Sequence, residues 1–254
     1  MLGRVLRSTL LCCLVALFLS SCYVVYEDKV AGEEKTGLEA YFQGQSGFNE
    51  EKFVNEQWES QVLPYVQENA DSLQEVLQAL REDPRGAMEE YGYREVADPK
   101  NPFAFLVEGS GVVVSTNTES RAGRAEIDLQ PTDGNVELLM QLGPVYQGSS
   151  VRDAIEFLKY EDFTNQMEWA SVGEALNTKA GQEIFDDISR ENLEGRTVGF
   201  SGAFSLYQDE TLEDVTPVLM PVTLSLQSSG SGEASATEQT SQESQTSGNT
   251  ESGS

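Results

Sequence analysis

Five polar residues in the middle of the chain could together recognise a small ligand. They are Arg121, Arg152, Asp162, Asn165 and Gln166. Polar groups of these types beside an aromatic side chain, here Trp169, are a common lining of pockets that bind sugar-like solutes. The same residues also have simpler roles open to them. Those at 162–166 can cap a helix, and both arginines can form buried ion pairs with some of the many carboxylates.

Missing residue types limit the chemistry of the chain. It contains no histidine, which excludes Ser-His-Asp and Cys-His nucleophiles and histidine metal sites. Cys12 and Cys13 lie in a segment that we expect to be removed, so Cys22 alone remains and no zinc ligand set is left. We therefore expect no metal and no other cofactor. Two carboxylates could still hydrolyse a glycosidic bond, so a carboxylate-based hydrolase is the third hypothesis for function.

The charge balance also excludes a class of partner. Sixteen Lys and Arg residues face 43 Asp and Glu residues, which gives a formal net charge of −27. Such a chain repels nucleic-acid backbones and anionic lipid headgroups, so we expect no nucleic-acid partner. The acidic excess is spread along the chain, which fits a strongly hydrated surface as well as a docking face for a basic partner.

Residues 1–21 are predicted to be a lipoprotein signal peptide. Two arginines precede an apolar run, Leu10 to Leu19, that is shorter than the about 20 residues needed to span a bilayer. The run ends in LSSC (19–22), which resembles a lipobox, whose cysteine carries fatty acids such as palmitate. The alternative is an ordinary signal peptide followed by a cysteine by chance. We expect a lipid anchor at Cys22 and an extracytoplasmic, periplasmic-side location in a bacterial cell envelope.

Two segments flank the folded part of the chain. Residues 22–47, from the lipidated cysteine onward, are predicted to form an acidic tether, and residues 228–254 a disordered tail. The tail contains no Leu, Ile, Val, Phe, Tyr or Trp, so it cannot bury enough apolar surface to offset the entropy of ordering. A spacer or a glycosylated stalk is the functional alternative for the tail. The folded domain is therefore expected at 48–227.

The first part of that domain, residues 48–95, is predicted to be helical. Apolar residues recur at helical spacing over 53–66 and again over 73–80. Ser72 is expected to cap the second of these helices through a capping box, and Asp83 to cap a third.

From residue 102 the apolar period changes to two, which predicts strands. Three strands are predicted at 103–114, 125–129 and 136–142. A helical section at 150–188 follows, and then two further strands at 197–206 and 218–226. This is the element order of an OB-type barrel, a five-stranded Greek-key barrel. We therefore predict an α+β fold, with N-terminal helices followed at 102–227 by an OB-like five-stranded β-barrel that has a helical insertion between strands 3 and 4.

The segment LGPVYQGSSVRD (142–153) joins the third predicted strand to the helical section. Gly148 frees the backbone, and Ser150 is expected to be the N-cap, with Asp153 in the reciprocal position. These features account for a strand-to-helix junction without a ligand. The alternative is that the start of the helix binds an anion or a sugar hydroxyl, with Arg152 close by.

Several motifs resemble those of the bacterial lipoprotein family DUF2291. They are SRAG (120–123), LGPV (142–145), RDA (152–154) and DFTNQ (162–166), together with WESQVLP (58–64), and the resemblance covers about 50–226. The chain departs from the family pattern at Arg124, where a Thr or small residue is usual, and at Tyr146-Gln147, where an aliphatic residue and an arginine are usual.

The resemblance implies a periplasmic lipoprotein with an OB-like barrel and no established activity. Genes of the family often accompany sugar ABC transporters, which implies an accessory role in solute uptake. Our leading hypothesis is a lipid-anchored, non-enzymatic accessory or binding module of a carbohydrate ABC uptake system, with a small sugar or a transporter component as its partner. The second hypothesis is a structural envelope lipoprotein that binds only protein partners.

Overall fold

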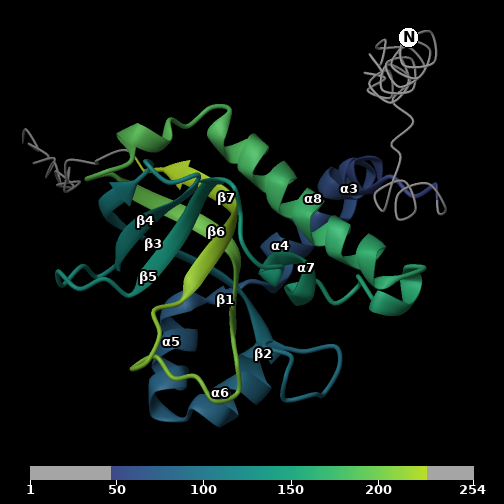
Figure 1. Cartoon of the computed structure of the whole chain (residues 1–254). Helices are drawn as coiled ribbons and strands as arrows, with labels where there is room; N and C mark the ends of the chain where they lie inside the picture. Colours follow the sequence, from purple (N-terminus) through teal and green to yellow (C-terminus); the bar gives the residue numbers. More distant parts are fainter. Residues whose placement is uncertain (1–46, 228–254) are drawn as a thin grey trace, which may run out of the picture. The chain divides into compact units, whose positions relative to one another are not determined.

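The computed structural model describes residues 47–227 (Figure 1). The predictions for the signal peptide, Cys22, the tether up to residue 46 and the tail from residue 228 fall outside the described residues. Within 47–227, no helix is both long enough and apolar enough to cross a bilayer.

Helices form the first part of the described chain, as the apolar spacing predicts. They are α3 (Glu50–Gln57), the π-helix η1 (Trp58–Val62), α4 (Leu63–Asn69), α5 (Leu73–Glu82) and α6 (Pro84–Tyr91). Asp83 caps α6, because its Oδ1 accepts a hydrogen bond from the Gly86 amide at 3.1 Å. Ser72 precedes α5 but makes no side-chain cap, so the capping box expected there does not form.

Five strands close into a barrel. They are β3 (Phe103–Asn117), β4 (Ala122–Leu129), β5 (Leu138–Pro144), β6 (Thr197–Leu206) and β7 (Val218–Leu226). Their order around the barrel is β3-β4-β5-β7-β6, and β6 pairs again with β3. The β5–β7 pair is parallel and the other four pairs are antiparallel. This is the predicted element order, and the β3–β6 pairing closes the barrel.

The longest strand, β3, pairs with β6 on one side and with β4 on the other. Its first ten residues pair with β6, while its second half pairs with β4 from Gly111 onward. The register of the β3–β4 pair shifts between Val113 and Ser115. Two short strands, β1 (Asp71–Ser72) and β2 (Gly92–Tyr93), also pair with β3.

The insertion between β5 and β6 contains a short helix and a long one. Its elements are α7 (Ser150–Ala154), the 3-10 turn η2 (Tyr160–Asp162), α8 (Gln166–Phe185) and the 3-10 turn η3 (Arg190–Asn192). Ser149, not Ser150, is the N-cap of α7, and its Oγ lies 2.6 Å from Asp153 Oδ2. Ser150 is buried, and its hydroxyl donates a 3.0 Å hydrogen bond to the carbonyl of Ala203.

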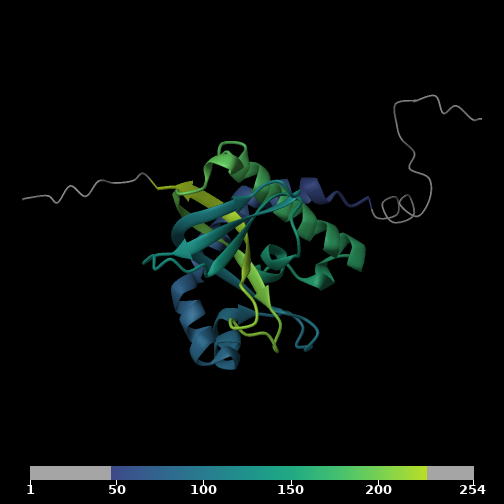
Figure 2. The same cartoon turned by 60° about the vertical axis from the view of Figure 1, so that its left-hand side comes forward.

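Two separate hydrophobic cores connect the barrel to the helices around it. The first fills the barrel and includes the apolar face of α5, with Leu73, Val76, Leu77 and Leu80. The second lies between the outer face of β3, β6 and β7 and helices α3, α4, α7 and α8. Figures 1 and 2 show the corresponding arrangement, with α5 and α6 below the barrel and α8 along its side. The second core therefore fixes α7 and α8 against the barrel wall.

Candidate functional site

A cavity of about 760 Å³ lies where the β3–β4 connection, the end of β5 and helix α8 meet. We call it the α8 pocket. Its polar lining residues include Arg121, Ser149, Arg152, Gln166, Glu174 and Asn177. The volume falls within the about 300–1,000 Å³ typical of small-molecule sites. Three of the five predicted site residues, Arg121, Arg152 and Gln166, therefore come together at one cavity.

A stripe of residues on α8 packs against the segment 146–152, which supplies part of the pocket lining. Gly173, Asn177 and Gly181 follow one another at intervals of four, so they share one face of the helix. A methyl group at Gly173 would press on Arg152 and Ser149, and one at Gly181 would collide with the Tyr146 ring. The absent side chains let the 146–152 segment approach α8 closely.

Asn177 is the central member of that stripe and is 3% exposed. Its Nδ2 donates a 2.9 Å hydrogen bond to the carbonyl of Gly148, which fixes the orientation of the amide. The Oδ1 atom is buried and accepts no hydrogen bond from any residue between 47 and 227. A buried acceptor without a donor costs free energy, so a bound donor in the pocket would stabilise this arrangement.

Two charged residues on the rim of the pocket are free to bind a ligand. The Arg121 guanidinium and the Glu174 carboxylate are exposed, and neither forms a hydrogen bond or ion pair with a described residue. The remaining lining charge, Arg152, is neutralised by Asp153. The formal charges around the pocket therefore sum to zero, in a chain whose net charge is −27. A neutral polar molecule fits this balance better than an anion.

Arg152 holds the pocket wall in place. The side chain is nearly buried, and its Nε and Nη2 donate to Asp153 Oδ1 at 2.8 and 2.5 Å. Nη2 also donates to Ser149 Oγ at 3.0 Å, and Nη1 to the Trp169 carbonyl at 2.9 Å. The guanidinium lies 4.1 Å from the centre of the Trp169 ring. These bonds tie α7 to α8 and leave Arg152 little capacity for a ligand.

The remaining predicted residues have different positions. Asn165 is the N-cap of α8, because its Oδ1 accepts hydrogen bonds from the amides of Met167 and Glu168 at 2.9 and 3.0 Å. Asp162 is exposed in η2 and lies outside the α8 pocket. Gln166 is exposed at the first turn of α8, where its side chain lines the pocket.

Tyr146 closes the pocket on the barrel side. Its ring lies in a slot between Gly143 and Gly181, where any larger residue would collide with it. Burial raises the pKa of the Tyr146 hydroxyl, and nearby Arg190 partly offsets that rise. The hydroxyl is therefore neutral at physiological pH and can serve as a hydrogen-bond donor.

The sequence was also compared with known families. It matches DUF2291, described as a predicted periplasmic lipoprotein, over residues 12–224. The chain belongs to this family. The family description confirms the expected location on the periplasmic side of the cell envelope. A search of curated proteins found no match.

The DUF2291 chain also resembles a solved structure. It is similar to an OB-fold protein of Thermotoga maritima, whose crystal structure was determined at 1.90 Å resolution. The two share 19% identity with a TM-score of 0.59, over 71% of this chain and 99% of the other. At this identity the likeness concerns the fold, and it confirms the predicted OB-like barrel.

Arg124 of β4 and Gln147, in the connection after β5, lie in contact in this DUF2291 protein. Arg124 Nη2 donates a 2.9 Å hydrogen bond to Gln147 Oε1. The backbone of Gln147 is held in turn by Gln141, whose amide bonds to both the N–H and the carbonyl of that residue at 2.7 and 2.9 Å. This polar cluster fixes the connection that leads from β5 into the pocket.

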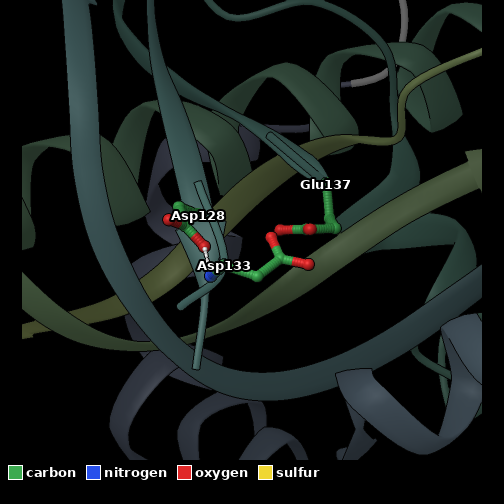
Figure 3. A group of neighbouring side chains, drawn as sticks. All are labelled: Asp128, Asp133 and Glu137. Atoms are coloured by element: carbon green, nitrogen blue, oxygen red, sulfur yellow. Dashed lines mark hydrogen bonds between the residues drawn. The ribbon is translucent and has the colours of Figure 1, made fainter. Parts of the chain in front are cut away.

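A separate group of carboxylates lies at the other end of the β4–β5 hairpin. Oxygen atoms of Asp128, Asp133 and Glu137 lie within 4.8 Å of one another (Figure 3). Asp133 and Glu137 also line a cavity of about 720 Å³. Three carboxylates could hold a hard cation such as calcium, which prefers oxygen ligands.

Each of these carboxylates already accepts hydrogen bonds from the backbone. Asp128 accepts from the amides of Asp133 and Gly134 at 3.2 and 2.9 Å, and Glu137 accepts from Leu129 at 3.0 Å. A bond from the Asn135 amide lowers the pKa of Asp133. A glycosidase acid needs a raised pKa, so Asp133 does not meet this requirement of the hydrolase hypothesis. The backbone bonds give the cluster a structural role in the 130–137 loop.

Proposed function

We propose that this lipoprotein binds a small neutral polyhydroxylated solute in the α8 pocket, as a non-enzymatic accessory of a carbohydrate ABC uptake system. The observation that carries the proposal is the unsatisfied Asn177 Oδ1 beside a cavity rimmed by the unpaired Arg121 and Glu174. A sugar offers hydroxyl donors to Asn177 and Glu174 and acceptors to Arg121. The balanced lining charge favours a neutral sugar over a charged one.

The proposed anchor is a lipid on Cys22, which would keep the domain at the membrane surface near a transporter. The match to a family of predicted lipoproteins extends from residue 12 and so includes this cysteine. Replacing Cys22→Ser should abolish labelling by radioactive palmitate and release the protein from the membrane fraction. A Cys13→Ser variant, which changes a cysteine ahead of the lipobox position, should stay labelled.

Sugar binding can be tested by thermal unfolding of the whole chain against a panel of pentoses and hexoses. A ligand at a hundred times its dissociation constant adds about 2.7 kcal/mol to the free energy of unfolding. In a domain of this size that raises the Tm by roughly 5–10 °C. The detergent must lack a sugar headgroup, so that it does not compete for the pocket.

Matched variants connect such a shift to the pocket. Arg121→Gln and Glu174→Gln each remove a rim charge, and we expect each to weaken binding of the active sugar about tenfold. Arg196→Gln and Glu213→Gln change exposed side chains outside the α8 pocket and should leave the affinity unchanged. If no sugar raises the Tm, the proposal fails, and pull-downs with envelope proteins become the next test.

A further inference from the structure

A second cavity, of about 380 Å³, adjoins the α8 pocket. We call it the β2 pocket, because Tyr93 of β2 and the loop that follows form one side of it. Arg152, Gln166 and Trp169 line both cavities. The wall between the two is therefore the stack of the Arg152 guanidinium on the Trp169 ring.

This shared wall is rigid. Arg152 is held by Asp153, Ser149 and the Trp169 carbonyl, and it is 9% exposed. The Trp169 ring is held on its other sides by Phe163 and Tyr160, with ring centres 5.3 and 6.2 Å away. A wall of this kind keeps the two cavities at a fixed spacing. Gln166 is exposed beside it and can reach a ligand in either cavity.

The β2 pocket is balanced in charge like the α8 pocket, although its Arg94 and Glu95 already form hydrogen bonds with described residues. One arginine, Arg94, and one glutamate, Glu95, line it in addition to the paired Arg152 and Asp153, so its formal charges also balance. The Tyr160 side chain is 44% exposed, and its hydroxyl makes no hydrogen bond within residues 47–227. This hydroxyl is a free donor and acceptor for a neutral polar group.

We propose that the two cavities are subsites of one site and that the ligand is a neutral disaccharide. One sugar unit would lie in each cavity, on either side of the Arg152–Trp169 stack, with Gln166 beside the link between the units. This inference rests on the proposed sugar-binding function, and it specifies the length of the ligand. A monosaccharide would fill one cavity and leave the polar groups of the other unused.

The test is isothermal titration calorimetry on the full chain in a detergent without a sugar headgroup. The probes are glucose with maltose and cellobiose, and xylose with xylobiose. We expect at least one disaccharide to bind about tenfold or more tightly than its own monosaccharide, with one molecule per chain. The gain comes from hydrogen bonds that only the second unit can make.

Removing the Tyr160 hydroxyl tests the contribution of the β2 pocket by itself. Tyr160→Phe keeps the ring contact with Trp169 and should weaken the disaccharide about three- to tenfold, with monosaccharide binding unchanged. Tyr207→Phe, which removes an equally exposed hydroxyl elsewhere, is the control. Equal affinities for disaccharide and monosaccharide, or no effect of Tyr160→Phe, would overturn the two-subsite proposal while sugar binding stands. Failure of every probe to bind would overturn the proposed function itself.

Discussion

The two ends of the β4–β5 hairpin carry cavities of similar size, about 760 and 720 Å³, that differ in how their polar groups are satisfied. At the end formed by the 130–137 loop, the carboxylates of Asp128 and Glu137 accept hydrogen bonds from backbone amides. At the α8 end, Asn177 Oδ1 has no donor among the described residues, and Arg121 and Glu174 have no ionic partner there.

The difference makes the α8 end the better candidate for a ligand, although the two cavities are similar in size. A carboxylate that accepts hydrogen bonds from its own loop already uses part of its hydrogen-bonding capacity to stabilise the fold. A buried acceptor without a donor has its capacity available for a ligand. We therefore expect substitutions in the acidic loop to change stability alone. Substitutions at the α8 pocket should change ligand binding as well, and the variants below test this separation.

The largest effect is expected for Arg152→Met, which removes a nearly buried cation from the α8 pocket wall. Asp153 loses its ionic partner, and the Trp169 carbonyl and Ser149 hydroxyl lose a donor. We expect the free energy of unfolding in urea to fall by about 2–4 kcal/mol. The matched variant Arg85→Met breaks an exposed i,i+4 pair with Glu89 and should cost under about 0.5 kcal/mol. Equal effects of the two would contradict the structural role of Arg152.

Asp128→Asn tests the acidic end. The amide keeps one acceptor and directs an N–H group at a backbone amide, so one of the bonds to Asp133 and Gly134 is lost. We expect a loss of about 1–3 kcal/mol in the free energy of unfolding, with sugar affinity unchanged. Asp209→Asn, at an exposed turn, is the control. A change in sugar affinity on replacing Asp128 would mean that the two ends are coupled.

Gly181→Ala tests the packing of α8 against Tyr146, which lines the α8 pocket. The new methyl group would collide with the Tyr146 ring, although alanine is favoured over glycine in a helix by about 1 kcal/mol. We expect a net loss of about 1–2 kcal/mol in stability and a loss of sugar binding, because Tyr146 must move. The exposed neighbour Gln182→Ala should do neither. A stabilised variant that still binds sugar would show that Tyr146 has room to relax.

The barrel was predictable from the sequence because each strand has a local signature. The alternation at 125–129 and 218–226 depends only on neighbouring residues, and the order of the elements then restricts the topology. Local cap positions were less certain. Ser149 and Ser150 are adjacent and chemically alike, and only packing against Ala203 decides that Ser150 is buried.

The pocket was only partly predictable, because residues distant in sequence form it. Arg121 and Gln166 reach the same cavity, but Asp162 and Asn165, which are close to Gln166 in the chain, do not line it. Glu174 and Asn177 also line the pocket and were not predicted. A signal for Asn177 does exist, since it is a polar residue on the apolar face of α8, between glycines at i−4 and i+4.

The smallest effect concerns the pH response of the acidic loop. The Asn135 amide donates to Asp133 Oδ1 and, together with the nearby Arg81, lowers the pKa of this exposed carboxyl. Because the folded pKa is below the ordinary value, the bond contributes fully above the unfolded pKa and is lost as the pH falls through the folded pKa. In an NMR titration, the pKa of Asp133 should therefore lie below the ordinary value of an aspartate in an unstructured peptide, and the Asn135 amide shift should follow it. If Asp133 instead titrated with the ordinary exposed carboxylates, the loop would not be held by its own backbone bonds, and the contrast between the two ends would weaken.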